Sequence, residues 1–386
     1  MKKIINCTIM MAAAMAVATS LTSCSDEKDD VVDNGVDATQ QAILSNYINT
    51  VVIPTYRQLA DAAIDLAEDC TDLTTQAKVD KACQDWKTAR KEWELSEAFL
   101  FGAAADYNID PHIDSWPLDL TQLDAVLKAG DIESRIENGT AGYGLLGFHA
   151  VEYVIFKEGS SGDASNRNRA YSTITPAEAV FAAAVAADMR DQCIRLEAAW
   201  AGLDKVSTAK QQMLEEAELE PTTNYGDRIV SAGLAGNTKY KTQAAAFEEI
   251  LVGASDIANE VGNAKISDPY ESHQWSDVES PHSWNSVTDF IDNILSVRNA
   301  YYGTLDGTVS SQSLSSHVAQ IDKAADAAVK AQINATIEAL KAIPTPFRNY
   351  ISETTDAATK AKIEAAIDAC NALVESLDAA QEAVVK

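Results

Sequence analysis

The stretch Leu145–Phe156, which reads LLGFHAVEYVIF, decides how this chain folds because it is apolar on nearly every side. It is twelve residues long, and Glu152 is its only formally charged side chain. A helix that is hydrophobic all round is typical of a protein interior. His149 and Glu152 are three positions apart, so a helix places them on one face. A buried carboxylate must be paired, hydrogen-bonded or bound to a metal, so other groups of the fold must meet these two.

The rest of the chain also predicts helices, since apolar residues recur at every third and fourth position and only 9 prolines occur among 386 residues. We expect Pro54 to kink the first helix. Thr175 and Pro176 should start a long helix as its N-cap and first helical residue. The expected helices cover residues 40–70, 77–101, 120–129, 145–156, 175–203, 240–261, 281–302, 314–342 and 345–385. The fold class that follows is all-α.

One region interrupts this pattern and marks a domain boundary. Residues 207–237 are weakly patterned and contain Pro221 and three glycines. We therefore expect two helical bundles joined there. The predicted organisation is a signal peptide over residues 1–23, a flexible acidic tether over 24–39, an N-terminal bundle over 40–206, a linker region over 207–237 and a C-terminal bundle over 238–386.

The first residues follow the pattern of a lipoprotein export signal. Lys2 and Lys3 precede an apolar run, and the segment ends in LTSC at residues 21–24. In this pattern Cys24 accepts the lipid, and the acidic residues after it resemble a signal for the outer surface. We expect an outer-membrane lipoprotein at the cell surface, with the periplasmic face as an alternative. A plain secretory signal with an incidental cysteine is the other interpretation.

The chain is strongly acidic, with 58 Asp and Glu against 30 Lys and Arg and a net charge of −28. Removal of residues 1–23, which hold two lysines and no acidic residue, makes the net charge −30. Because such a surface repels phosphate groups, nucleic acid is excluded as a partner. The membrane is then a partner only through the lipid anchor.

Four cysteines, Cys70, Cys83, Cys193 and Cys370, remain after the signal peptide and Cys24 are set aside. Cys70 and Cys83 flank an expected helix–helix turn and could form a disulfide bond across it. The alternative is four buried free thiols. No CxxC motif and no zinc-type spacing of Cys and His occurs.

The apolar stretch contains a motif, and further motifs lie on both sides of it. Residues 147–152 read GxHxxE. Upstream are WKTAR at 86–90, WELSEAFLFG at 93–102 and DPHIDSWP at 110–117; downstream are ESPHSWNS at 279–286 and NILSVRNAYYG at 293–303. Together they resemble the imelysin family, whose members are described as cell-envelope metallopeptidases or as imelysin-like domains of bacterial iron-uptake proteins. The resemblance implies two four-helix-type bundles side by side.

The resemblance also nominates the residues of a site. It places Glu97, from the second helix, and Asp114, from the following loop, with His149 and Glu152. One imidazole with two or three carboxylates suits iron, manganese, zinc or calcium. The alternative is a His149–Glu152 pair fixed by hydrogen bonds without a metal. HExxH is absent, and Tyr153 stands where HxxEH would have its second histidine.

A pocket is expected around these residues, shaped by Trp116, Tyr153 and Gly147. The segment Glu279–His282 matches the ExxH pattern of di-iron bundles, but Pro281 lies inside it and favours a helix start instead. The free backbone N–H groups of such a helix start could bind an anion or a carboxylate near the first site. The pocket residues nominated from this segment are Ser280, His282 and Ser283.

The function that these residues favour is binding of iron or another divalent metal, or of a small charged ligand that carries one. Other iron-uptake components of the envelope would then be partners. The alternative is a metallopeptidase in which the metal held by the same residues activates water. That alternative lacks a second histidine and a recognisable oxyanion donor. An interaction protein with a polar core is a third possibility.

Overall fold

The computed structural model describes residues 36–156 and 167–386, and every regular element within these ranges is helical. The all-α fold class predicted from the sequence is therefore confirmed. The described residues form one compact unit. None of their helices is long and apolar enough to cross a membrane. The predicted signal peptide and the predicted lipid acceptor Cys24 lie outside the described residues.

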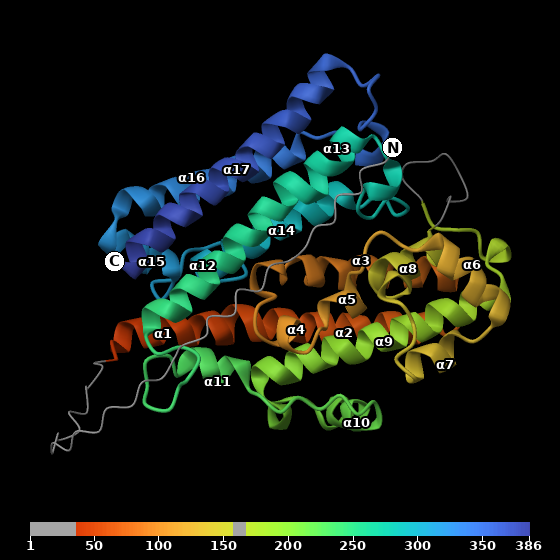
Figure 1. Ribbon diagram of the computed structural model, residues 1–386, viewed down its shortest axis with the longest axis horizontal. Coiled ribbons are helices and arrows are strands. Elements are labelled where there is room, and N and C mark those ends of the chain that lie inside the picture. Colours follow the sequence, from red (N-terminus) through yellow and green to blue (C-terminus); the bar gives the residue numbers. More distant parts are fainter. Residues whose placement is uncertain (1–35, 157–166) are drawn as a thin grey trace, which may run out of the picture. The chain divides into compact units, whose positions relative to one another are not determined.

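The first half of the chain contributes α1 (Ala38–Asn46), α2 (Ile53–Cys70), α3 (Gln76–Glu94), α8 (Gly147–Ile155) and α9 (Pro176–Ala201). Helix α2 packs along both α3 and α9, and the short α8 contacts α3 and α9 (Figure 1). The apolar stretch quoted above is thus an interior helix, with Phe148, Val151 and Ile155 fully buried. Thr175 caps α9 and Pro176 is its first residue, as predicted.

The second half contributes α12 (Gln243–Glu260), α14 (Ser286–Tyr302), α15 (Leu314–Ile321), α16 (Lys323–Lys341) and α17 (Ala357–Val385). Helix α17 packs along α12 and α16, and α14 also contacts both of these helices (Figure 1). On α16, Val329, Ile333 and Leu340 are buried at helical spacing, which explains why this face packs inward.

The two groups of helices meet where α12 and α14 contact η2 (Glu97–Phe99) and where α14 contacts α3. Gly253 permits part of this approach. A Cβ at Gly253 would lie 2.5 Å from the carbonyl oxygen of Ala98, so a larger residue would push α12 away from η2. The candidate site described below lies at this meeting of α3, η2, α8 and α14.

Short helices connect the long ones. Between α3 and α8 the chain forms η2, α4 (Ala103–Asp106), α5 (Asp110–Ile113), α6 (Leu120–Ala129), α7 (Ile132–Glu137) and η3 (Tyr143–Leu145). The predicted linker region contains α10 (Thr208–Glu216) and α11 (Tyr225–Val230), which both pack on α9. The division of the chain into two bundles at residues 207–237 stays a prediction.

Two wide turns of π-helix precede prolines inside long helical runs. The first, η1 (Tyr47–Val52), joins α1 to α2 ahead of Pro54. The second, η6 (Val261–Ser267), joins α12 to α13 (Asp268–Ser272) ahead of Pro269. Proline has no N–H for the helical ladder, and a wider turn redistributes the neighbouring hydrogen bonds. The helical run from residue 38 to residue 70 therefore passes through Pro54 without ending.

Several helix ends predicted from the sequence were wrong. The second helix ends at Glu94 rather than at residue 101, and the chain then turns through Gly102 at a φ of +72°. The helix predicted over 314–342 breaks at Asp322, whose side chain accepts hydrogen bonds from the first N–H groups of α16. Likewise, Asp356 caps α17, which begins at Ala357 rather than at residue 345. Capping aspartates thus fixed ends that apolar periodicity alone had extended.

The four cysteines of the described residues are free and buried, so of the two alternatives the Cys70–Cys83 bridge is absent there. Burial raises the pKa of the Cys70 thiol to about 12, which keeps it protonated at neutral pH. The alternative of four buried thiols that act as small hydrophobic side chains fits the structure.

Candidate functional site

His149 lies on α8 with a carboxylate on each side of its ring. Its Nε2 atom is 3.2 Å from Oδ1 of Asp114, and its Nδ1 atom is 3.4 Å from Oε2 of Glu152. Asp114 follows α5 directly and is oriented by Trp93, whose indole N–H donates to Oδ2 at 2.7 Å. The ring of His149 is only 3% exposed. The two residues of the motif and Asp114 are therefore brought together in the interior.

Gly147 allows α8 to start directly against the end of α5. Its φ is +79°, and a Cβ there would lie 2.2 Å from the carbonyl oxygen of Ile113. Any other residue would push α8 away from the backbone just before Asp114. The glycine of GxHxxE thus positions His149 against Asp114. It does not line the pocket, contrary to the role predicted for it.

Glu152 is held by the turn that precedes α14. Its Oε1 atom accepts hydrogen bonds from the backbone N–H groups of His282, at 3.0 Å, and Ser283, at 2.7 Å. The hydroxyl of Ser283 donates a third bond at 2.7 Å. The sequence predicted N–H groups in this segment that could bind a carboxylate, and that carboxylate is Glu152.

The predicted helix start at Ser280–Pro281 was wrong, because α14 begins at Ser286. Ser280 and Trp284 adopt left-handed φ angles of 47° and 65°, so the segment forms a tight turn. The hydroxyl of Ser280 donates to Oδ2 of Asp289 at 2.5 Å rather than facing the pocket. Its role in the site is therefore to fix Asp289.

A fully buried arginine, Arg90 on α3, connects the acidic residues around His149. Its guanidinium contacts the carboxylates of Asp114 and Glu94. It also lies 2.5 Å from Oε1 of Glu279 and 3.6 Å from Oδ2 of Asp289. Since a buried charge needs partners, Arg90 and these carboxylates require one another.

Lys265 on η6 is a second buried cation. Its Nζ atom lies 3.2 Å from Oε1 of Glu279, 3.4 Å from Oε2 of Glu94 and 3.8 Å from Oε1 of Glu97. Burial alone would lower the pKa of Lys265, but the surrounding carboxylates raise it well above its usual range. Lys265 therefore stays charged and links the two helix groups electrostatically.

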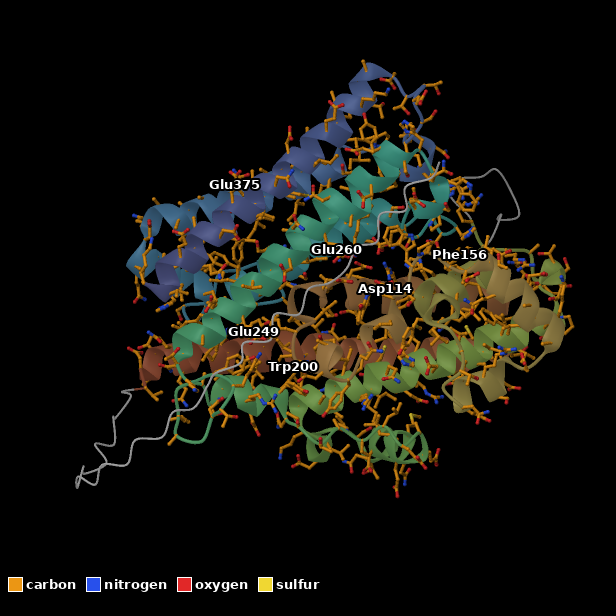
Figure 2. All side chains as sticks on the ribbon, in the orientation of Figure 1. Asp114, Phe156, Trp200, Glu249, Glu260 and Glu375 are labelled. Carbon is orange, nitrogen blue, oxygen red and sulfur yellow. The ribbon has the colours of Figure 1, made fainter. Side chains whose placement is uncertain are left out.

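Glu97 joins this assembly through Lys265, and one of its carboxylate oxygens lies within 4.8 Å of a ligand atom of Asp114. It lines a separate cavity of about 320 Å³ together with Glu249, Asp256 and Glu260 of α12. Figure 2 labels Glu249 and Glu260 on α12, and it places Asp114 in the region between the two groups of helices. Burial raises the pKa of Glu97 well above its usual range, although Lys265 opposes that shift.

We call these residues the buried cluster: Arg90, Glu94, Glu97, Asp114, His149, Glu152, Lys265, Glu279 and Asp289. Each of these residues is at most partly accessible to solvent. The carboxylates of the cluster outnumber its two permanent cations, Arg90 and Lys265. Burial would lower the pKa of His149, but its interactions with Asp114 and Glu152 raise that pKa to about 9. For Asp114, burial is outweighed by Arg90, which holds the pKa well below its usual range. The cluster thus favours positive charge at His149.

Two groups of ligand atoms in the cluster have spacing that suits a metal. Asp114, His149 and Glu279 place one ligand atom each within 4.8 Å of one another, and so do Glu94, Glu97 and Asp114. Among the described residues, Oε2 of Glu279 is buried without a hydrogen bond, and Nε2 of His149 has only its contact with Asp114 at 3.2 Å. The residue types fit an oxygen-rich site with one imidazole. His149 and Glu97 do not belong to the same group, so the predicted set of four is divided.

A small cavity of about 50 Å³ reaches His149 and Glu152. It is lined mainly by apolar and aromatic side chains, which include Trp116, Trp275 and His282. Trp116 and His282 therefore lie where the sequence analysis expected a pocket. Tyr153 does not line the cavity but packs edge-on against the ring of His282, with centroids 5.3 Å apart. The volume suits an ion or a few atoms rather than a polypeptide segment.

Sequence reasoning missed Arg90, Glu94, Lys265, Glu279 and Asp289. One signal was present: Arg90 and Glu94 are four positions apart, so they share a face of α3, and Trp86, Ala89 and Trp93 beside them are buried as well. Glu279 had been set aside because Pro281 follows it. Lys265 carried no signal, since its inward direction depends on the π turn that contains it.

Comparison with known proteins identifies the family. The family model for imelysin matches residues 52–379. The chain is 27% identical to iron-regulated protein A of Synechococcus elongatus over 320 aligned residues. This alignment covers 81% of this chain and 80% of that protein. A crystal structure named for an iron-regulated protein A precursor of Parabacteroides distasonis aligns with a TM-score of 0.75 and 27% identity, over 89% of this chain and 95% of that one.

A second crystal structure shares the fold at lower identity. It is an imelysin-like protein of Psychrobacter arcticum, with a TM-score of 0.60 and 12% identity over 88% of this chain and 94% of that chain. The family model spans most of the sequence, including every motif from residue 86 to residue 303. This chain belongs to the imelysin family.

Proposed function

We propose that this protein binds a metal cation in the buried cluster, with iron as the first candidate. The observation that carries the proposal is the group of Asp114, His149 and Glu279, whose ligand atoms lie within 4.8 Å of one another and which includes a buried carboxylate oxygen, Oε2 of Glu279, without a hydrogen bond. The excess of carboxylates over Arg90 and Lys265 favours added positive charge. The name of the Synechococcus relative, an iron-regulated protein, is the reason to test iron before other metals.

In this proposal the metal replaces the added proton of His149, which supplies the imidazole ligand, and Asp114 and Glu279 supply carboxylate oxygens. Glu152 is a positioning residue, since three donors fix its Oε1 atom while its Oε2 atom faces Nδ1 of His149. Such partners orient a ligating histidine and commonly change metal affinity by about 10- to 100-fold. The bound metal would supply a Lewis-acidic centre. Glu97 belongs to the second group and would hold a cation there.

The test is metal titration of purified protein with ferrous iron, manganese, zinc and calcium, followed by elemental analysis. We expect His149→Ala and Glu279→Gln each to weaken binding at least about tenfold. His273→Ala is the matched control, because His273 contacts the carbonyl of Ile351 outside the cluster. The proposal fails if the unmodified protein takes up no metal, or if His149→Ala binds as the unmodified protein does.

A binding role agrees better with the cavity than the alternative of a metallopeptidase. A peptidase must admit an extended backbone to the metal, whereas the cavity that reaches His149 has a volume of about 50 Å³. Chelator-sensitive cleavage of a protein substrate, lost in Glu152→Gln, would favour the peptidase instead.

We also propose that the protein works in the cell envelope, anchored through a lipid on Cys24, with iron-uptake components as partners. The support is the LTSC motif at residues 21–24 after an apolar run. Membrane fractionation tests this. If Cys24→Ala stays in the membrane fraction as the unmodified protein does, the anchor is not at Cys24.

A further inference from the structure

A third cavity, larger than the two described above, lies among α7, α9 and α10. Its volume is about 820 Å³, within the range of a few hundred to about 1,000 Å³ that is typical of small-molecule sites. We call it the α9 cleft. Three alanines of α9, Ala183, Ala184 and Ala187, line part of it and leave room for a ligand. None of the residues of the buried cluster lines it.

Six carboxylates line the α9 cleft, and one arginine, Arg195, is the only Lys or Arg among the residues that line it. Asp188 contacts the ring of His112 at 2.9 Å, and Asp191 pairs with Arg190 at 2.8 Å. The other four make no ion pair and no side-chain hydrogen bond with the described residues: Glu133, Glu137, Glu216 and Glu218. Open carboxylates of one sign attract a cationic ligand.

Gln192 presents an unsatisfied amide to this cleft. It is 4% exposed, and its Oε1 atom has no hydrogen-bond partner among the described residues. A buried polar group without a partner is unfavourable, because it has lost its hydrogen bonds to water. A ligand that bonds to Gln192 would remove that penalty.

Arg195 is one helical turn after Gln192 and also lacks a polar partner. It forms no ion pair with the described residues although six carboxylates line the same cleft, and its Nε atom is buried without a hydrogen bond. Burial lowers its pKa, and no carboxylate offsets that effect. The guanidinium stacks on Tyr107, 4.3 Å from the ring centroid. Stacking fixes the plane and leaves the N–H groups at its edge able to bind a carboxylate.

We propose that the α9 cleft binds a small organic cation that carries one carboxylate, such as a dipeptide of basic amino acids. The carboxylate would accept hydrogen bonds from Arg195, and an N–H group of the ligand would donate to the unpartnered Oε1 atom of Gln192. The ammonium groups would pair with the open glutamates of α7 and α10. A simple diamine would leave Arg195 unpaired, and a dicarboxylate would meet six acidic side chains. This site does not depend on the metal site proposed above.

The test is calorimetric titration of purified protein with dilysine, with dilysine amide, with cadaverine and with diglutamate. We expect dilysine to bind at least about tenfold more tightly than its amide or cadaverine, and diglutamate not to bind. Arg195→Ala should weaken the binding of dilysine at least about tenfold. This variant should bind dilysine and its amide equally, because the partner of the ligand carboxylate is gone. Gln192→Leu should also weaken dilysine.

Glu216→Gln should weaken dilysine, whereas Glu215→Gln is the matched control, since Glu215 is exposed on the same helix and does not line the cleft. Circular dichroism checks that each variant folds; Arg195 is partly exposed, so its variant serves if Gln192→Leu does not fold. The proposal is overturned if dilysine does not bind, if cadaverine binds equally well, or if Arg195→Ala still distinguishes dilysine from its amide.

Discussion

The buried cluster and the α9 cleft use the same residue types in opposite ways. In the cluster, Arg90 touches four carboxylates and is fully buried. In the cleft, Arg195 forms no ion pair with any carboxylate of the described residues, although six carboxylates line the cavity. The cavity at the cluster holds about 50 Å³, whereas the cleft holds about 820 Å³.

The two arginines therefore differ in role: a charge with close partners stabilises the fold, and a charge without them is available to a ligand. A buried charge with close partners depends on them, so its removal should destabilise the protein. Removal of a charge beside open space costs the protein little stability, because water already solvates part of that charge. Substitutions in the cluster should therefore change stability strongly, and substitutions in the cleft should change binding with little effect on stability.

The largest effect is expected for Arg90→Met. The change leaves the carboxylates of Asp114, Glu94 and Glu279 without their shared partner, and loss of one member of a buried ion pair typically destabilises by about 3–5 kcal/mol. We expect the upper part of that range in chemical denaturation. Arg135→Met is the matched control, because Arg135 pairs with Asp131 and both are 40% exposed; its effect should stay below about 1 kcal/mol. Equal losses in the two variants would remove the distinction drawn here.

Gly147→Ala should have the next largest effect. A Cβ would lie 2.2 Å from the carbonyl oxygen of Ile113 at a φ of +79°, so we expect a loss of about 3 kcal/mol from the clash and the strained backbone. Gly130→Ala is the control: its φ is +67°, but nothing lies within 4 Å of the added atom. The free energy of unfolding of Gly130→Ala should fall by only about 1 kcal/mol in the same denaturation experiment. If both variants unfold alike, close approach of α5 is not what Gly147 provides.

Asp292→Asn should stabilise the protein in alkaline solution. Asp292 is 5% exposed, its Oδ2 atom has no hydrogen bond among the described residues, and burial raises its pKa to about 7. The folded state therefore retains a proton between about pH 4 and 7 that the unfolded state has lost, so stability falls as the pH rises through this range. We expect a gain of about 2 kcal/mol at pH 8 that shrinks towards zero near pH 4. A gain independent of pH would contradict this cause.

The smallest change in stability is expected for Arg195→Ala. Arg195 makes no ion pair with the described residues, so only its packing on Tyr107 is lost, about 0.5–1 kcal/mol. Binding of dilysine should fall while the melting curve hardly moves. A loss of stability as large as that of Arg90→Met would show that the cleft supports the fold in the same way as the cluster.

The sequence predicted the part of the site that depends on local spacing. His149 and Glu152 share a face because they are three residues apart on an apolar helix, and a rule of helix geometry is enough to find them. Asp114 and Glu97 came from the resemblance. The structure places Asp114 at His149, whereas Glu97 lies close to Asp114 but shares no group of ligand atoms with His149 among the described residues. The all-α class followed from periodicity alone.

What the sequence could not predict depends on contacts between distant segments. Glu279 and Lys265 reach the cluster from parts of the chain more than a hundred residues after His149, and no local pattern marks them as inward. The prediction for residues 280–284 was wrong for a related reason. Its Ser–Pro pair favours a helix start, but the bonds from His282 and Ser283 to Glu152 hold the backbone in another form. Tertiary contacts outweighed local preference there.

The π turn η6 makes the second cation of the cluster sensitive to chain length. An α-helix rotates by about 100° for each residue, so one residue more or less in a helical run turns all later side chains to another face. Lys265 lies within this turn and points into the cluster. Loss of a single residue from the turn would leave a regular helix and carry the ammonium group away from its carboxylates. Here the number of residues in one turn, as well as their identity, sets the electrostatics of the site.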